Sequence, residues 1–463
     1  MDNVVVAAYF ALMVGAGLYG MRRARTEDDF LVAGRRLGYG FYAGTLAAVV
    51  LGGASTIGGV RLGYLYGISG MWLVVMLGLG IVVLSVVFSK RLTSLEVYTV
   101  SQVLGQRFGA PPRLIGGLVM VAYDMMVAVT ATLAIGTVFD VMLGIPRLPA
   151  ILVGGGLVVA YSALGGMWSI TLTDVLQFVI MTVGIFFVLL PMAVSDAGGW
   201  DGMRATLPES YFDVGAIGTD TILTYFLIYF FGIIIGQDVW QRVFTARDHK
   251  VAQRAGLGAG LYCIAYAVAG AVIGMAAQAL LPDLAVPDNA FATVAKEVLP
   301  DGVRGLVLAA ALAAVMSTAS ACTLAASTIL TTDVIGKGEE SLRTQRLSIL
   351  AVGTAVIVVA CLVQDVVAGL TIAYNLLVGG LLVPIIGALV WRRATARAAL
   401  AAIVSGSVVV TFFMVRDGML ANTPIYWGLA TSALFFVVVT FVGGGSTTRP
   451  PVSEPAGSPA VGP

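Results

Sequence analysis

Residues 47–70 read AAVVLGGASTIGGVRLGYLYGISG, a glycine-rich stretch inside an otherwise apolar segment. Gly52, Gly53, Gly58 and Gly59 flank small and hydroxyl-bearing residues. Close packing of membrane helices alone explains one or two such glycines. A cluster of them around a Ser-Thr pair also favours local unwinding, which at membrane depth occurs only where the backbone is buried in protein or lines a cavity. Interrupted helices of this kind mark binding sites in membrane carriers.

The composition places this stretch in a membrane. Of the 463 residues, 59% are hydrophobic and only 11% are charged, whereas soluble domains have about 25% charged residues. We therefore expect an all-α polytopic membrane protein. The net charge of +1 gives no sign of a nucleic-acid partner, and the single histidine and three scattered cysteines argue against a zinc or haem site.

A helix needs about 20 apolar residues to cross the hydrocarbon core. The sequence predicts about thirteen such spans, at roughly 3–21, 39–66, 70–88, 113–143, 148–165, 172–195, 221–243, 254–281, 302–332, 343–364, 367–392, 396–416 and 423–442.

The basic residues predict the orientation of these spans. Arg22, Arg23 and Arg25 follow the first apolar run, whereas a cleaved signal peptide has its positive charge before that run. With the N-terminus outside, most of the 26 basic residues fall in cytoplasmic connectors. We expect a multi-pass protein of the plasma membrane with a cytoplasmic C-terminus, and residues 443–463, rich in Gly, Pro and Ser, as a disordered tail.

A second stretch, AAVMSTASACTLAAST at 313–328, places many hydroxyls in an apolar helix. Ala314, Ser317 and Thr318 share one helix face. These hydroxyls either bond to carbonyls of their own helix or a neighbour, or meet carbonyls freed by the break at Ala54 and Ile57. In the second case five neutral oxygens surround one point. Hard cations prefer oxygen ligands, so this arrangement predicts a sodium site.

At these residues the chain resembles the sodium:solute symporter family. Four stretches carry the resemblance: GGASTIGG, YSALGGMWSITLTDVLQ (161–177), GQDVWQRVFTARD (236–248) and LPDGVRGLVLAAALAAVMSTASA (299–321). The resemblance implies a LeuT-type core of two inverted five-helix repeats. The expected organisation is an extra helix and cytoplasmic loop (1–38), a first repeat (39–195), an extracellular loop (196–220), a second repeat (221–392), two further helices (393–442) and the tail (443–463).

The resemblance also implies site residues. It assigns the sodium ligands to the carbonyls of Ala54, Ile57 and Ala314 and the hydroxyls of Ser317 and Thr318. Some members bind a second sodium, for which Asp174, Ser317 and Ser320 match. The next position is Ala321 here, where those members have serine, so this second site is incomplete. Asp174 is otherwise a buried acceptor or a stop on the sodium exit path.

Two ionisable residues inside predicted spans point to the solute. Arg61 follows the break and Asp124 lies within the span 113–143; charges at this depth are functional candidates by default. The two either neutralise each other or bind a solute with a carboxylate, such as an amino acid whose ammonium group lies near Asp124. Further candidate solute contacts are Thr56 and the aromatic residues Tyr229, Phe230 and Tyr374, the last three also being common packing residues.

The predicted function is sodium-coupled symport of a small organic solute into the cell by alternating access. The partners are the solute, sodium ions and the lipid bilayer. A membrane enzyme is disfavoured because no His cluster, Asp-rich cluster or phosphate-binding Gly loop is present. A proton-coupled carrier and a transporter-derived channel or sensor stay as alternatives. The solute, the number of sodium ions and the oligomeric state are left open.

Overall fold

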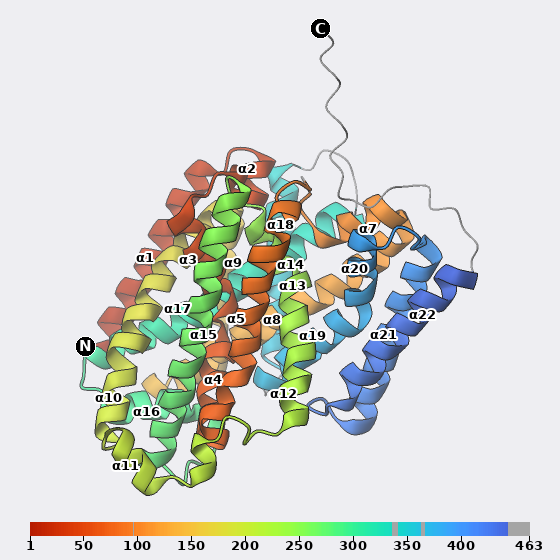
Figure 1. Ribbon diagram of the computed structural model, residues 1–463. Coiled ribbons are helices and arrows are strands. Elements are labelled where there is room, and N and C mark those ends of the chain that lie inside the picture. The colour runs from red at the N-terminus through yellow and green to blue at the C-terminus, as the bar shows by residue number, and fades with distance from the viewer. Residues whose placement is uncertain (96, 336–340, 363–365, 443–463) are drawn as a thin grey trace.

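The computed structural model describes residues 1–95, 97–335, 341–362 and 366–442, so the predicted tail lies outside the described residues. The described chain folds into one bundle of long helices (Figure 1). The helices of the N-terminal half are α1 (Asp2–Arg23), α2 (Glu27–Val32), α3 (Tyr39–Val50), α4 (Gly53–Tyr66), α5 (Trp72–Val83), α6 (Ser89–Leu92), α7 (Val100–Phe108), α8 (Ala110–Leu143), α9 (Arg147–Met181), α10 (Leu190–Asp196) and α11 (Gly199–Thr206).

The C-terminal half continues the all-helical pattern. Its helices are α12 (Thr219–Tyr225), α13 (Phe231–Ile235), α14 (Gln237–Val243), α15 (His249–Leu280), α16 (Ala290–Val298), α17 (Val303–Ile329), α18 (Leu342–Ala360), α19 (Val366–Leu377), α20 (Val383–Val390), α21 (Ala396–Asp417) and α22 (Thr423–Val442). The all-α membrane class predicted from the sequence is confirmed.

The described residues contain 10 helices long and apolar enough to span a membrane, or 11 if one bent pair is a single span. Two of these, Gly53–Leu92 and Arg147–Asp196, have 40 and 50 residues, about twice the length of one crossing. The first turns through a tight segment at Gly67–Met71 and the second bends at Gly166, where φ is 52°. Tyr39–Val50 is too short to be counted by itself. The count of thirteen therefore stays a prediction.

Helix α17 lies at the centre of the bundle. In the most apolar part of this segment, 94% of the residues are buried. Helices α8, α9, α1 and α3 all pack against α17. Its alanines, serines and threonines let these neighbours approach closely. The N-terminus of α17 is fixed by α1: Asp2 Oδ1 accepts hydrogen bonds from the N–H groups of Gly302 and Gly305 at 2.7 and 3.0 Å, and Oδ2 accepts one from Arg304 Nε at 2.7 Å.

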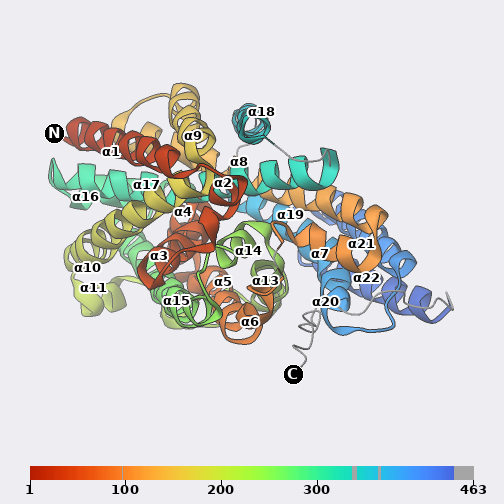
Figure 2. The same ribbon diagram turned by 90° about the horizontal axis from the view of Figure 1, so that it is seen from above.

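Two of the membrane segments are broken. The first break separates α3 from α4 at Leu51 and Gly52. The second separates α13 from α14 at Gly236, where the chain bends by 44°. Helices α3, α4 and α14 pack against α17, and the view from above shows α13 next to α14 (Figure 2). Each break lies in the first helix of a predicted five-helix repeat, although the repeat boundaries stay a prediction.

Helices α4 and α15 approach each other through glycine. A Cβ added at Gly274 would lie 2.3 Å from the carbonyl oxygen of Val60 and 2.5 Å from the nitrogen of Tyr64. These are backbone atoms, which cannot move aside as a side chain can. The half-helix after the break is therefore held against α15 by direct backbone contact.

We predict that Gly274→Ala lowers the melting temperature of the purified protein by several degrees, because the added methyl overpacks this contact at a cost of about 1–3 kcal/mol. Gly258→Ala is the matched control, since Gly258 lies on the same helix with nothing within 4 Å of the added Cβ. Equal melting temperatures for the two variants would contradict the packing described here.

Candidate functional site

The last carbonyls of α3 are satisfied by hydroxyl groups. A helix end leaves its final carbonyls without partners in the helix. Here Ser317 Oγ donates to the Ala48 carbonyl at 2.8 Å and Thr318 Oγ1 donates to the Val49 carbonyl at 2.7 Å. The next two carbonyls accept from residues after the break: Val50 from Ser55 at 2.6 Å and Leu51 from Thr56 at 3.2 Å.

This geometry agrees with one half of the predicted sodium set and differs in the other. Ala314, Ser317 and Thr318 come together, since Ser317 Oγ also donates to the Ala314 carbonyl at 2.9 Å. Ala54 and Ile57, however, lie after the break, in the first turns of α4. The helix ends at Val50, one turn before the centre of the glycine cluster, so the carbonyls that Ser317 and Thr318 contact belong to Ala48 and Val49.

The break and Thr318 border a small cavity in the bundle. Its volume is about 20 Å³, and its wall includes Gly52, Ser55, Thr318, Asp238 and Tyr374. Apolar side chains of α3, α5, α8, α13 and α19 complete the lining. This volume holds about one water-sized occupant. The structure is therefore closed around a point where both broken helices meet α17.

A second, larger cavity of about 260 Å³ lies near the start of α12. Arg61, Tyr66, Thr224, Tyr225 and Thr371 are among its lining residues, together with Asn422 and neighbouring apolar groups. Its lining is more polar than that of the small cavity, and α12 and the α21–α22 connection border it. We call it the outer cavity.

Arg61 and Asp124, the two ionisable residues predicted to contact the solute, do not pair with each other in the structure. Arg61 pairs with Asp288, with Nε 3.3 Å from Oδ1. Asp124 is fully buried, and its carboxyl group lies near the main-chain N–H of Asp238 and the charged side chains of Asp238 and Arg242. The alternative that Arg61 and Asp124 neutralise each other is therefore wrong: the partner of Arg61 comes from the segment before α16.

A ladder of tyrosine rings joins the two cavities. Tyr225 lines the outer cavity and its ring centroid is 5.3 Å from that of Tyr229. Tyr229 is 5.1 Å from Tyr374, which in turn is 5.2 Å from Tyr123. Tyr123 donates a hydrogen bond to Asp238 Oδ1 at 3.2 Å. Tyr229 and Tyr374, predicted to contact the solute, thus lie between the cavities.

Phe230 and Thr56 are placed differently. Phe230 stacks on Phe226 at 4.8 Å and packs edge-on against Phe231 at 5.1 Å, and it lines neither the small cavity nor the outer cavity. Thr56 lies at the break, where its hydroxyl also forms a hydrogen bond with Tyr266 of α15 at 2.8 Å. Thr56 therefore connects the break to α15.

Four buried charged residues form a cluster beside the small cavity: Asp124, Asp174, Asp238 and Arg242. Asp174 Oδ2 accepts a hydrogen bond from Thr45 of α3 at 2.5 Å and lies 3.4 Å from Arg242 Nη2. Arg242 Nη1 donates to the main-chain carbonyl of Asp238 at 3.4 Å. Three carboxyl groups thus surround one guanidinium, linking α3, α8, α9 and α14.

The predicted second sodium set is only partly assembled. Ser320 Oγ donates to the Ser317 carbonyl at 2.9 Å, one turn from the first hydroxyl pair. The carboxylate of Asp174 instead faces Thr45 and Arg242. The Arg242 guanidinium lies beside the Asp174 carboxylate, where the second sodium ion was predicted to bind.

The end of the bundle opposite the outer cavity is closed by polar contacts. Asp333 after α17 accepts from Arg113 Nε at 2.8 Å and from Ser101 Oγ at 2.6 Å. Gln237 Oε1 accepts from the Val100 N–H at 2.7 Å, which ties the second break to α7. These contacts cross between segments far apart in the chain, so this end must rearrange before the small cavity can open on that side.

Two broken helices that face one cavity at the middle of a membrane bundle define a membrane carrier. A profile of the sodium:solute symporter family matches residues 30–406. The chain belongs to the sodium:solute symporter family, and it is accordingly a transporter rather than an enzyme, with sodium as the coupling ion of its family.

Individual relatives agree with this assignment. The chain is 26% identical over 487 aligned residues to sodium/proline symporters of Staphylococcus aureus strains RF122 and JH9, covering 96% of this chain and 93% of theirs. A substrate-bound outward-open structure of a Na⁺-coupled sialic acid symporter superimposes with a TM-score of 0.83 at 19% identity, over 95% of this chain and 97% of that one. Mhp1, a nucleobase-cation-symport-1 transporter, follows with a TM-score of 0.60 at 16% identity, over 89% and 94%. These likenesses establish the LeuT-type fold.

Sequence reasoning missed three residues that shape the site: Gly236, Asp238 and Arg242. All lie in GQDVWQRV, which was assigned to a continuous span. The available signal was a glycine followed directly by two polar residues inside an apolar run, a pattern that also marks an interrupted helix.

We predict that Gly52→Ala reduces sodium-dependent uptake more than about tenfold. The added Cβ would lie 2.3 Å from Thr318 Oγ1, so α3 and α17 must separate. Gly59→Ala on α4 is the control, because its added Cβ makes only an ordinary contact of 3.7 Å with Val74. Transport by proteoliposomes containing each variant measures the difference, and normal uptake by Gly52→Ala would disprove the close approach.

Proposed function

We propose that this chain imports a small organic solute together with sodium by alternating access. The observation that carries the proposal is the contact of Ser317 and Thr318 with the carbonyls at the end of α3. A sodium ion at this point would be bound by the Ala48, Val49 and Ala314 carbonyls and the two hydroxyls. Neutral oxygens suit a monovalent hard cation that must also dissociate. The predicted carbonyls of Ala54 and Ile57 lie after the break, in the first turns of α4, and stay a prediction.

The groups around the small cavity favour a solute with a carboxylate, such as an amino acid, which would bind once the cavity widens beyond its present volume of about 20 Å³. Helix α4 begins at Gly53 without a side-chain cap, and Gly52, Gly53, Ala54 and Ser55 line the cavity. The N-terminus of a half-helix attracts anionic solute groups through its free N–H groups and its dipole. The relatives named for proline and sialic acid transport carboxylic acids. Arg61, the other predicted carboxylate partner, lines the outer cavity, and its contact with the solute stays a prediction.

The two cavities fit the outward half of a transport cycle. Solute would enter the outer cavity and pass the tyrosine ladder between Tyr225 and Tyr374 to reach the break. Sodium would hold α3 against α17 while the ladder closes. Opening the opposite end then requires the contacts of Asp333 and Gln237 to break, after which low internal sodium lets both ligands leave.

One sodium ion supplies enough free energy for concentrative uptake. A charge crossing 100 mV yields about 2.3 kcal/mol, and a tenfold sodium gradient adds about 1.4 kcal/mol. Together these support roughly 500-fold accumulation of a neutral or zwitterionic solute. An anionic solute entering with one sodium would lose the voltage contribution.

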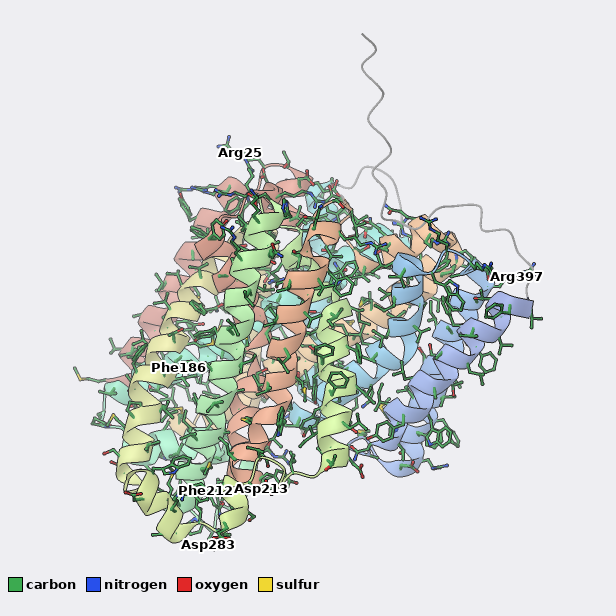
Figure 3. All side chains as sticks on the ribbon, viewed as in Figure 1. Arg25, Phe186, Phe212, Asp213, Asp283 and Arg397 are labelled. Carbon is green, nitrogen blue, oxygen red and sulfur yellow. The ribbon has the colours of Figure 1, made fainter. Side chains whose placement is uncertain are left out.

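We place the cytoplasm at the end of the bundle that carries Arg25 and Arg397 (Figure 3). Asp213 and Asp283 lie at the other end. Basic connectors favour the cytoplasmic side. This puts the start of α1 outside and the outer cavity on the extracellular side. Lys337 and Arg449, which the same rule places inside, lie outside the described residues.

Proton coupling is the second candidate function. The observation that favours it is the fully buried carboxyl group of Asp124, which lies near a second acidic side chain, that of Asp238. Uptake that persists when potassium replaces sodium but stops with a proton uncoupler would select this alternative. A second sodium at Asp174, Ser317 and Ser320 stays a prediction, with Arg242 as its competitor.

We predict that Thr318→Ala raises the sodium concentration for half-maximal uptake about tenfold or more, because one ligand oxygen is lost. Thr323→Ala is the matched control: Thr323 is buried on the same helix, but its hydroxyl donates to the Ala319 carbonyl of α17 itself at 2.7 Å. The sodium dependence of initial uptake rates measures both. Identical sodium dependence in Thr318→Ala and the wild-type protein would remove the proposed site.

A further inference from the structure

Asp238 is a charged group in the wall of the small cavity. It lies in the first turn of α14, directly after the second break, and only 3% of its surface is exposed. The cavity wall otherwise consists of apolar side chains, hydroxyls and one tyrosine. This carboxylate faces the same space as Thr318 and the start of α4. The inference rests on the proposed function, since it concerns the solute of that cavity.

The surroundings of Asp238 carry an excess of negative charge. The buried cluster contains the carboxyl groups of Asp124, Asp174 and Asp238 and the single guanidinium of Arg242. Arg242 Nη2 points to Asp174, and Arg242 Nη1 donates to the main-chain carbonyl of Asp238 and not to its carboxylate. The cluster thus contains three acidic side chains and one basic side chain.

The direct partners of the Asp238 carboxylate are neutral. Tyr123 donates to Oδ1 at 3.2 Å and the Cys322 thiol lies 3.8 Å from Oδ2. A buried carboxylate is costly inside a membrane protein and marks a ligand or ion pathway. The charged neighbour of Asp238 is Arg242, whose Nη2 is shared with Asp174.

We propose that Asp238 binds a positively charged nitrogen of the solute. The carried class is then an amino acid or another solute with a protonated amine. Neutral sugars and carboxylic acids without an amine are excluded, because they would leave Asp238 desolvated and unpaired in the closed state. Tyr123, which ends the tyrosine ladder, holds the carboxylate in position, so closing of the ladder is coupled to the solute's charged group.

The first experiment uses the wild-type protein and needs no substitution. Thermal shift is measured in sodium chloride and in potassium chloride with the twenty amino acids, their decarboxylated amines, their deaminated acids and neutral hexoses. We expect sodium-dependent stabilisation only by compounds with a protonated amine. For the best amino acid, the deaminated analogue should bind about 100-fold more weakly, as expected for an unpaired buried charge.

Each outcome of this screen has one meaning. Stabilisation by a hexose or by a deaminated acid at comparable concentration overturns the inference, as does a protein stabilised by sodium that responds to none of the amines and amino acids. If sodium has no effect, with or without solute, the proposed sodium site is overturned instead. The role of Asp238 is then decided by whether compounds with a protonated amine stabilise the protein more than the deaminated acids do.

The second experiment tests the residue. Asp238→Asn keeps the shape of the side chain and removes its charge, so we expect affinity for the amino acid to fall about 100-fold while stabilisation by sodium alone changes less than about twofold. Asp140→Asn, an exposed acidic residue of α8, is the control and should change neither. Unchanged discrimination between amino acid and deaminated acid in Asp238→Asn would overturn the assignment.

Discussion

The structure depends on the contact between the end of α3 and the hydroxyl pair of α17. A helix that stops in the middle of a membrane leaves carbonyl groups that lipid cannot satisfy. Ser317 and Thr318 satisfy two of them, and Ser55 and Thr56 satisfy the next two from within the same broken segment. The break is therefore stable only while α17 lies against it. A cation that bonds the same oxygens can strengthen or replace this contact, which makes the position of α3 depend on sodium.

The second break supplies the complementary chemistry. Oxygens at the end of α3 are suited to a metal ion, the free N–H groups of α4 are suited to an anionic group, and the carboxylate at the start of α14 is suited to a cationic one. All three border one cavity. A zwitterionic solute and a sodium ion together would satisfy these polar groups at the same time. This offers a physical reason for coupling: each ligand would bond polar groups that the other does not reach, so the two together would stabilise the closed state more than either alone.

Much of the architecture could be predicted from sequence, because it follows from local patterns. Apolar length gave the helical membrane class, and the Ser-Thr spacing on α17 placed Ala314, Ser317 and Thr318 on one face. The break was located one turn too late, because Gly58 and Gly59 belong to helix packing rather than to unwinding: the added Cβ atoms would contact Val367 and Val74. Long-range partners could not be predicted. Asp288, which pairs with Arg61, lies in another segment of the chain, and Asp238 was hidden in a run that reads as one continuous span.

The central claim is tested most directly by an experimental structure of the protein solved in sodium and again in a sodium-free potassium buffer. We predict an ion between the last turn of α3 and α17 in sodium, bound by the Ala48, Val49 and Ala314 carbonyls and by Ser317 and Thr318. Without sodium, we expect α3 to be less firmly held against α17. An ion bound elsewhere, with both hydroxyls still donating to Ala48 and Val49, would contradict this claim.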